Sequence, residues 1–217
     1  MSFKIKILVC DDDLTARILM KETLSSEFVE VLEAENGQRA VELFETHHPS
    51  LILLDVSMPK MNGFEVCEHI RGHEKGKHIP VIMVTGSDDI DSIHKSYAVG
   101  ATDFIAKPIK WPILGQRVKY ILRASQAFED LVTQKQALHQ LAFYDSHTGL
   151  ANRQHLMKDL PQFLSRAKRN NHQAAMLFID LDRFKRINVT MGHSYGDKLL
   201  GKVAARLQAN LRDGELC

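Results

Sequence analysis

Cysteine is scarce in this sequence of 217 residues, and its three copies lie far apart, at Cys10, Cys67 and Cys217. An odd number of cysteines without a CxxC pair provides neither a disulfide framework nor the ligand spacing of a zinc site. Long apolar runs are missing too. None approaches the roughly 20 residues that span a bilayer, and the N-terminus reaches three aspartates too soon for a signal peptide. We therefore expect a cytoplasmic protein without a membrane partner.

An excess of charge of either sign is also missing. Lys plus Arg number 28 and Asp plus Glu number 27, so no broad basic field is available to hold nucleic acid. No helix-turn-helix pattern with basic recognition positions is present either, which argues against a transcription factor. The length allows one large domain or two ordinary ones.

Short β-branched apolar runs alternate with amphipathic stretches between about residues 4 and 106. The expected strands are Ile5–Cys10, Val29–Ala34, Leu51–Asp55, Val81–Thr85 and Asp103–Ala106. The third and fourth runs are almost entirely apolar, which is typical of central parallel strands covered on both faces. This fivefold βα repeat predicts an α/β fold with a doubly wound parallel sheet of five strands.

A different pattern follows Pro112. Residues 116–143 contain no glycine and predict one long helix. Apolar residues recur in it at heptad a and d spacing, at Ile121, Ala124, Phe128, Leu131, Leu138 and Ala142. Lys135 interrupts the a positions. We interpret the helix as a stalk that pairs two copies in parallel, and a helix packed only on its own domain is the alternative.

A third segment begins at about Tyr144. It predicts a helix over residues 154–168, a strand over residues 174–179 that ends in Asp180, and a helix over residues 195–211. The expected organisation is therefore a first domain over residues 1–124, a helical stalk over residues 125–143 and a partial α+β domain over residues 144–217.

Several polar side chains follow the expected strands of the first domain, where parallel strands open a ligand crevice. They are Asp11, Asp12 and Asp13 after the first strand, Asp55 at the end of the third, Thr85 at the end of the fourth and Lys107 after the fifth. Two carboxylates about 4 Å apart repel by about 4 kcal/mol at an effective dielectric of 20. Such a cluster needs a cation, and oxygen ligands suit Mg²⁺.

This set of residue types indicates phosphoryl chemistry. A carboxylate beside a divalent cation can attack phosphorus, so Asp55 is the candidate nucleophile, and Thr85 and Lys107 would receive the phosphate oxygens. Capping of a helix by Asp12 or Asp13 is the alternative, but it does not explain the other strand ends. A phosphatase that forms a phosphoaspartate would need an acid where Ser57 stands.

The motifs that carry these residues are ILVCDD (residues 7–12), LDVSMPKMNG (54–63), VTG (84–86) and AKP (106–108). Through them, residues 3–124 resemble the flavodoxin-like receiver domain of bacterial response regulators. The resemblance implies that a histidine kinase or phosphotransfer protein phosphorylates Asp55. It also implies that Asp12, Asp55 and the Ser57 carbonyl hold Mg²⁺ with support from Asp11, that Thr85 and Phe104 act as switch residues, and that a cis-proline follows Lys107.

A second set of polar residues follows the expected strand over residues 174–179. Asp180 and Asp182 share one face if the strand continues, which would suit a metal ion. Lys185 and Arg186 come within reach of phosphates, and residues 192–197 turn into a helix whose N-terminus favours anions. The alternative is a capping box at residues 194–197, with ordinary core residues around it.

Two motifs decide between these interpretations, DSHTGLANR (residues 145–153) and FIDLDRFKRIN (178–188). Through them, residues 140–217 resemble the GGDEF domain of diguanylate cyclases. The resemblance implies that Asp180 binds Mg²⁺ with the Leu181 carbonyl. The residues that it assigns to the GTP site are Asn188, Asp197, Lys185 and Phe184. His147 and Val189 stand where Leu and Asp are usual.

The Gly-Gly-Asp-Glu-Phe hairpin that names that family would come after Cys217. The resemblance therefore implies that this chain as it stands lacks half of the second metal site and is inactive as a cyclase. We expect a response regulator that forms a homodimer through receiver and stalk, and that joins two GTP into cyclic di-GMP only in a full-length form. The alternative is a non-catalytic module, which either binds partners in a phosphorylation-dependent way or serves as a phosphate sink.

Overall fold

The computed structural model describes residues 4–86 and 90–211. Its chain divides into two compact units, Met1–Glu129 and Asp130–Cys217, which we call the first and the second unit. No helix among the described residues is long and apolar enough to cross a membrane.

The first unit contains one sheet of five parallel strands in the order β2-β1-β3-β4-β5. The strands are β1 (Ile5–Cys10), β2 (Val29–Ala34), β3 (Leu51–Asp55), β4 (Val81–Thr85) and β5 (Asp103–Ala106). The helices are α1 (Leu14–Leu24), α2 (Gly37–His47), α3 (Gly63–Gly72), the short 3₁₀ helix η1 (Glu74–Gly76), α4 (Ile90–Ala98) and the first part of α5 (Trp111–Phe143), which continues into the second unit. All five expected strands and the doubly wound parallel fold are confirmed.

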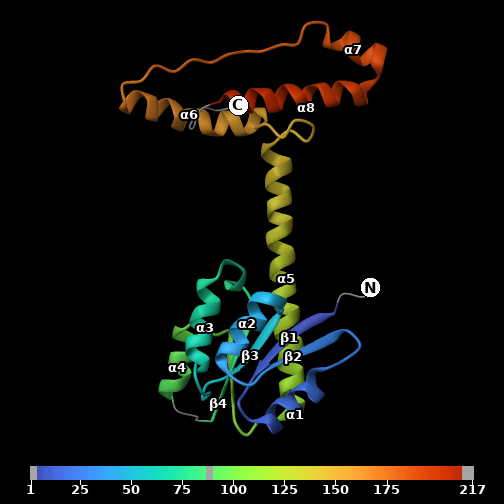
Figure 1. Ribbon diagram of the computed structural model, residues 1–217. Coiled ribbons are helices and arrows are strands. Elements are labelled where there is room, and N and C mark those ends of the chain that lie inside the picture. The colour runs from blue at the N-terminus through green and yellow to red at the C-terminus, as the bar shows by residue number, and fades with distance from the viewer. Residues whose placement is uncertain (1–3, 87–89, 212–217) are drawn as a thin grey trace. The chain divides into compact units, whose positions relative to one another are not determined.

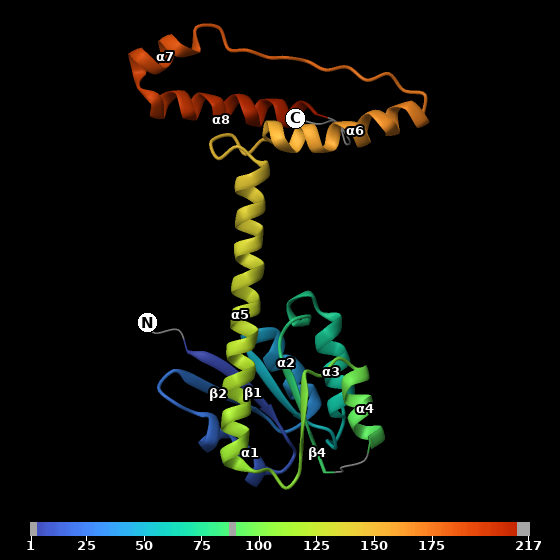
Figure 2. The ribbon, with the colours of Figure 1, turned by 180° about the vertical axis from the view of Figure 1, so that it is seen from behind.

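Helices cover the sheet on both faces (Figures 1 and 2). One core cluster joins α2 and α3 to the sheet around Phe44 and Ile70, and the other joins α1 and the start of α5 around Met20 and Leu114. Every residue of β3 and β4 is buried. These two strands are apolar along almost their whole length because both of their faces pack against helices.

Side-chain caps start the helices that follow the strands. Asp13 caps α1 by accepting a hydrogen bond from the Thr15 backbone N–H at 2.8 Å, so the capping alternative is right for this aspartate. Asn36 caps α2. Asn62 and Glu65 form a reciprocal capping box at α3. The caps fix where each helix leaves the carboxyl edge of the sheet.

The predicted long helix is confirmed as α5, which starts at Trp111, before the expected residue 116. Pro112 lies in its first turn, where a missing backbone N–H costs nothing. Leu114 and Val118 are buried in the first unit. The heptad residues Phe128, Leu131 and Leu138 are 51%, 63% and 67% exposed. Pairing of two stalks stays a prediction.

The second unit contains α6 (Arg153–Arg169), α7 (Phe184–Met191) and α8 (His193–Asn210). Helices α6 and α8 lie close to the predicted ranges, whereas α7 was not predicted because eight residues inside an expected loop give little periodic signal. Helix α8 begins directly after Gly192, without a side-chain cap. The capping-box alternative at residues 194–197 is therefore wrong.

The expected strand over residues 174–179 is wrong in this structure. The segment between α6 and α7 is drawn as an extended loop (Figure 1), and the described part of the second unit contains no strand. Leu177 and Phe178 are 83% and 94% exposed. An apolar run becomes a strand only when a neighbouring strand completes its hydrogen bonds, and none lies beside this one among the described residues.

Candidate functional site

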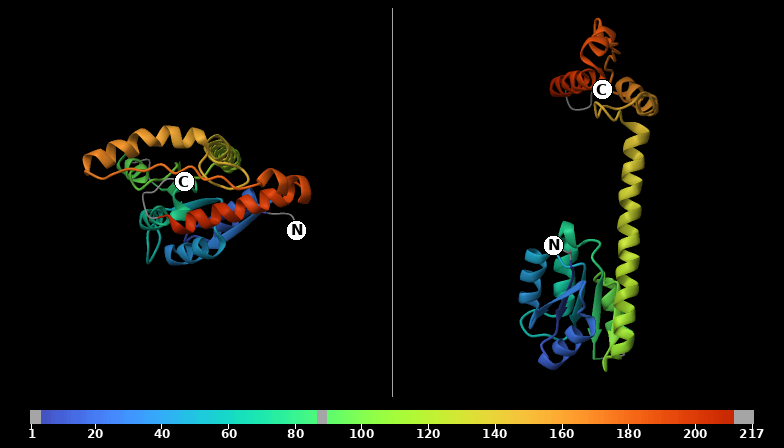
Figure 3. Two further views of the ribbon diagram at one scale, coloured as in Figure 1. Left: turned by 90° about the horizontal axis from the view of Figure 1, so that it is seen from above. Right: turned by 90° about the vertical axis from the view of Figure 1, so that its right-hand side faces the viewer.

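The candidate site lies at the carboxyl edge of the sheet in the first unit. Asp11 follows β1, Asp55 ends β3, Thr85 ends β4 and Lys107 follows β5. The strands are adjacent in the order β1-β3-β4-β5, and all are parallel. Their ends therefore meet at one edge, with the helices layered on either side of the sheet (Figure 3).

Lys107 joins the two buried carboxylates. Its Nζ lies 2.9 Å from Oδ2 of Asp11 and 2.8 Å from Oδ1 of Asp55. Asp11 is fully buried, and Asp55 and Thr85 are each 3% exposed. The ion pairs confirm that residues from three separate strand ends come into direct contact.

Asp12 completes an acidic cluster with Asp11 and Asp55. One carboxylate oxygen from each lies within 4.8 Å of the others, and in the described part of the chain no other three Asp, Glu, His or Cys side chains approach so closely. The second oxygen of Asp11 accepts a hydrogen bond from the Asp13 backbone N–H at 2.9 Å. Both Asp11 oxygens are thus engaged, so Asp12 and Asp55 are the better placed ligands for a cation.

The electrostatics of the cluster also favour a cation. Burial raises the pKa of Asp55, the hydrogen bond from Lys107 lowers it, and the charge of Asp11 raises it again, so the pKa is raised overall. Burial works to lower the pKa of Lys107, but its bonds to Asp55 and Asp11 prevail and raise it. Lys107 is therefore charged at neutral pH. One ammonium faces three carboxylates, and a hard divalent cation with oxygen ligands fits the remaining charge.

Two glycines hold the loop that follows Asp55 close to the sheet. A Cβ atom on Gly63 would lie 2.3 Å from the Asp55 carbonyl oxygen, and one on Gly37 would lie 2.3 Å from the Met61 carbonyl oxygen. Neither position has room for a side chain. Ser57 is exposed within this loop. After β5, the Lys107–Pro108 peptide bond is cis, as expected.

The two expected switch residues lie on neighbouring strands. Thr85 pairs with Ala106, and Phe104 pairs with Met83 in the same ladder. The Phe104 ring packs edge-on against Tyr97 of α4, with ring centroids 6.1 Å apart. Because Phe104 has no hydroxyl, any change in its position acts through packing alone.

Arg17 of α1 was missed by the sequence analysis. Its guanidinium donates hydrogen bonds to the backbone carbonyls of Asp11 and Asp12. A usable signal was present in the sequence, because a cation near the N-terminus of a helix opposes the helix dipole.

The residues expected to bind nucleotide in the second unit are only partly brought together. Oδ1 of Asn188 is buried without a hydrogen-bond partner, and a Cβ atom on Gly196 would lie 1.8 Å from it. The next residue, Asp197, lies 3.9 Å from Nδ1 of His147. Asn188 therefore packs against Gly196, the residue before Asp197.

The other expected residues of the second unit do not converge on a metal site. Asp180 and Asp182 are exposed on the segment without strand pairing, as is Lys185 on α7. Leu181 and Phe184 are half-buried. Asp180 belongs to no acidic cluster among the described residues.

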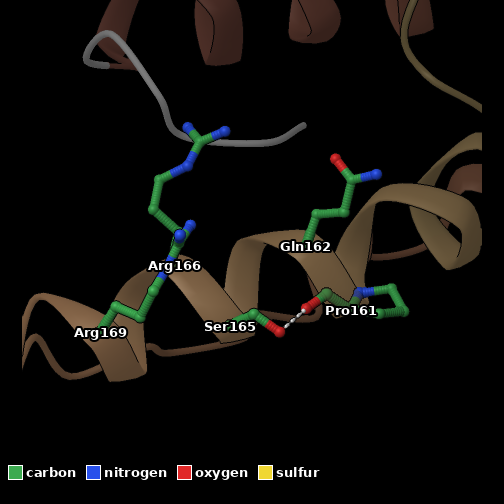
Figure 4. A pocket seen from close by; sticks show the side chains of 5 residues that line it. All are labelled: Pro161, Gln162, Ser165, Arg166 and Arg169. Carbon is green, nitrogen blue, oxygen red and sulfur yellow. Dashed lines mark hydrogen bonds between the residues drawn. The ribbon is translucent and has the colours of Figure 1, made fainter.

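A separate hollow of about 330 Å³ lies along α6 (Figure 4). Pro161, Gln162, Ser165, Arg166 and Arg169 line it. The Ser165 hydroxyl donates a hydrogen bond to the Pro161 carbonyl at 2.8 Å. All five residues belong to one helix, and none is an expected site residue, so this hollow is not the candidate site.

Comparison with known protein families agrees with the geometry of the candidate site in the first unit. The model of the response regulator receiver domain matches residues 7–119, which is more than half of the chain. The chain belongs to the response regulator receiver family. The model of the diguanylate cyclase GGDEF domain matches residues 142–217, so the chain combines a receiver domain with a GGDEF output domain.

Individual relatives cover different parts of the chain. The probable transcriptional regulator ycf27 of Cyanophora paradoxa is 37% identical over 123 residues, which are 57% of this chain and 50% of that protein. Response regulator PleD of Caulobacter vibrioides is 30% identical over 162 residues, which are 75% of this chain and 36% of PleD. The chain thus spans about half the length of the curated relatives that match its receiver domain, and less of PleD.

Solved structures match the receiver domain. The chemotaxis protein CheY4 of Vibrio cholerae is similar with a TM-score of 0.52 and 29% identity over 54% of this chain and 98% of CheY4. The signal receiver domain of a putative LuxO repressor protein from Vibrio parahaemolyticus has a TM-score of 0.55 and 29% identity, over 60% of this chain and 98% of that one.

Proposed function

We propose that this response regulator accepts a phosphoryl group on Asp55 from a histidine kinase or phosphotransfer protein. The observation that carries the proposal is the placement of Asp55. It is buried, in contact with Lys107 at 2.8 Å, and within 4.8 Å of the carboxylates of Asp11 and Asp12. The proposed nucleophile, its counter-charge and the proposed cation ligands thus lie together at one edge of the sheet.

The residues that would hold Mg²⁺ are Asp12, Asp55 and the carbonyl of Ser57, with Asp11 behind them. When bound, Mg²⁺ neutralises negative charge on the phosphoryl oxygens, so that a carboxylate can approach phosphorus. The observations that favour a divalent cation are the excess of carboxylates over ammonium groups and the raised pKa of Asp55.

In the transfer step an Asp55 carboxylate oxygen attacks phosphorus. The new P–O bond makes an acyl phosphate, and the P–N bond of the donor phosphohistidine breaks with its electron pair going to the imidazole nitrogen. Lys107 lies beside the attacking group and would pair with a new phosphate oxygen in place of a carboxylate oxygen. The Thr85 hydroxyl, at the end of β4 between the strands that carry Asp55 and Lys107, would donate a hydrogen bond to another phosphate oxygen.

Phosphorylation would reach the rest of the chain through this rearrangement. The new group adds a charge of about −1.5 to −2, which changes the contacts available to Lys107 and Thr85. Phe104, on the neighbouring strand, would then repack against α4. We expect the altered face to favour a homodimer through the receiver and the α5 stalk, and the shift can only be as large as the difference in affinity between the two states.

The proposed output is synthesis of cyclic di-GMP from two GTP by paired GGDEF domains in a form that continues through the signature hairpin. Asn188 and Asp197 would read the guanine, and the unpartnered Oδ1 of Asn188 supports this role. Lys185 and Phe184 would complete the nucleotide site. Asp180 and the Leu181 carbonyl would bind Mg²⁺ there.

Labelling with acetyl phosphate and Mg²⁺, read by intact-protein mass spectrometry, tests the first step. We expect one phosphoryl group on the wild type and none on Asp55→Asn. Asp103→Asn is the matched control, because Asp103 lies at the start of β5 and pairs with Arg117 instead of the site. Undiminished labelling of Asp55→Asn would refute the assignment.

The output needs a separate test. A form extended through the hairpin should make cyclic di-GMP from GTP, and phosphorylation should raise both its turnover and its dimer affinity in sedimentation experiments. If the extended form dimerises on phosphorylation but makes no product, the chain is instead a non-catalytic module that binds partners according to its phosphorylation.

A further inference from the structure

Arg17 makes an unusual contact with the acidic site. One terminal nitrogen of its guanidinium lies 2.8 Å from the backbone carbonyl oxygen of Asp11 and 3.1 Å from that of Asp12. The side chain is half-buried. Arg17 thus touches the backbone that carries both carboxylates and leaves the carboxylates themselves uncontacted.

The contact is notable for what Arg17 does not do. It forms no ion pair within residues 4–86 and 90–211, although three aspartates lie four to six positions before it. It also lies near the N-terminus of α1, where a positive charge is unfavourable for the helix dipole. A half-buried arginine in this place needs a compensating role, and the two carbonyls are the partners that the structure supplies.

Asp12 is the residue that this contact would position. Its side chain is exposed, and the described residues provide no hydrogen bond to its carboxylate. Asp11, in contrast, is held by Lys107 and by the Asp13 N–H. The direction of the Asp12 carboxylate therefore depends on its backbone. Arg17 holds this backbone through hydrogen bonds to the carbonyl of Asp11, just before Asp12, and to the carbonyl of Asp12 itself.

We propose that Arg17 is a positioning residue of the acidic site, which fixes the Asp11–Asp12 backbone so that the Asp12 carboxylate faces Asp55. The proposal rests on the proposed Mg²⁺-dependent phosphorylation of Asp55. It extends the site to a residue on α1 that would touch neither the phosphoryl group nor the cation.

Positioning and simple charge predict opposite effects on cation binding. If Arg17 acted only through its charge, removing it would make the site more negative and Mg²⁺ would bind more tightly. If it orients the backbone, removing it would let Asp12 turn towards solvent and Mg²⁺ would bind more weakly. The direction of the change in Kd therefore separates the two roles.

The experiment is calorimetric titration of the purified full chain with Mg²⁺. We expect Arg17→Met to raise the Kd about tenfold, which corresponds to about 1.4 kcal/mol. Arg17→Lys should recover part of the affinity and stay about threefold weaker than wild type, because a compact ammonium is a poorer match for two carbonyls. The matched control is Lys21→Met, which removes an exposed cation of the same helix that pairs with Glu33 and should leave the Kd unchanged.

A second readout uses the rate of labelling by acetyl phosphate. For Arg17→Met the rate should fall at low Mg²⁺ and return to the wild-type value at saturating Mg²⁺. A purely structural defect would lower the rate at every Mg²⁺ concentration. Thermal unfolding of each variant identifies any that do not fold. If Arg17→Met does not fold, the expected threefold rise in the Kd of Arg17→Lys for Mg²⁺ decides the question.

The possible results are distinguishable. A Kd for Arg17→Met equal to or lower than that of the wild type would overturn the positioning role. If the wild type itself does not bind Mg²⁺, the proposed function fails whatever the Arg17 variants do. If the wild type binds and the Arg17 variants are unaffected, only the role of Arg17 is lost.

Discussion

Replacing Asp55 with Asn should make the protein more stable at neutral pH when no divalent cation is present. The carboxylate charge of Asp55 lies within 4.8 Å of the carboxylates of Asp11 and Asp12 and 2.8 Å from the Lys107 ammonium. At an effective dielectric of 20 the two repulsions amount to about 7 kcal/mol and the attraction to about 6 kcal/mol. These charge terms nearly cancel, so the cost of burying the Asp55 carboxylate decides the sign.

The expected gain is about 1–2 kcal/mol, because Asn keeps the size of the side chain and carries no charge to bury. For a domain of this size, each kcal/mol shifts the unfolding temperature by roughly 4 °C. Thermal unfolding followed by circular dichroism should therefore place the receiver transition of Asp55→Asn about 4–8 °C above that of the wild type.

The gain should depend on pH. Burial, as the largest cause, raises the pKa of Asp55 above its ordinary value of 3.8, so the folded protein holds this proton more tightly than the unfolded chain does. The wild type therefore loses stability as the pH rises from 3.8 through the raised pKa, and the Asn variant has no such loss. The two proteins should be equally stable below the ordinary pKa and differ fully at pH 7.

Two controls sharpen the test. Asp103→Asn removes another carboxylate of the same sheet, which lies 3.6 Å from Arg117 of α5. This substitution should give no gain in stability. Saturating Mg²⁺ should stabilise the wild type more than Asp55→Asn, because only the wild type retains the full ligand set. If Asp55→Asn is less stable than the wild type at pH 7 without Mg²⁺, the attraction to Lys107 outweighs burial and the reasoning is wrong.

Three further substitutions test other parts of the structure. Gly63→Ala places a Cβ atom 2.3 Å from the Asp55 carbonyl oxygen. It should lower the free energy of unfolding in urea by about 2 kcal/mol and slow labelling by acetyl phosphate. The control is Gly72→Ala, whose Cβ atom would meet nothing within 4 Å and which should be neutral or stabilising. Lys107→Met leaves two buried carboxylates without their counter-charge and should cost about 2–3 kcal/mol at pH 7. The loss should shrink in acid, because Asp55, whose pKa burial raises, then takes up a proton. Asn152→Ala removes the cap of α6 and should lower stability by about 1 kcal/mol, seen as an earlier loss of helical circular dichroism on heating.

The sheet of the first unit was predictable from the sequence because each strand is marked twice. An apolar run shows that a strand is buried on both faces, and a polar residue such as Asp55 or Thr85 shows where it ends. The parallel order then places those ends together. What the pattern could not supply is the contact geometry. That one ammonium on Lys107 reaches both Asp11 and Asp55, or that Arg17 turns back to two backbone carbonyls, depends on side-chain directions set by tertiary packing.

The failed strand over residues 174–179 shows the limit of the same reasoning. Its apolar pattern is as strong as that of β3, yet Leu177 and Phe178 are exposed and no described strand pairs with the segment. Periodicity reports which residues could be buried in a sheet, and it says nothing of whether a neighbour is present. In the first unit each run has neighbours on at least one side, and so each becomes a strand.

The junction between α5 and α6 lies within the second unit, and it shows how a change in the stalk would reach α6. The Asn152 side chain donates a hydrogen bond to the Ala142 carbonyl at 2.8 Å and accepts one from the His155 N–H at 3.0 Å. Its backbone N–H also bonds to the Phe143 carbonyl at 2.8 Å. One residue thus ties the end of α5 to the start of α6. Since turning one helix about its axis would break these bonds unless the other followed, a rotation of the stalk carries α6 with it.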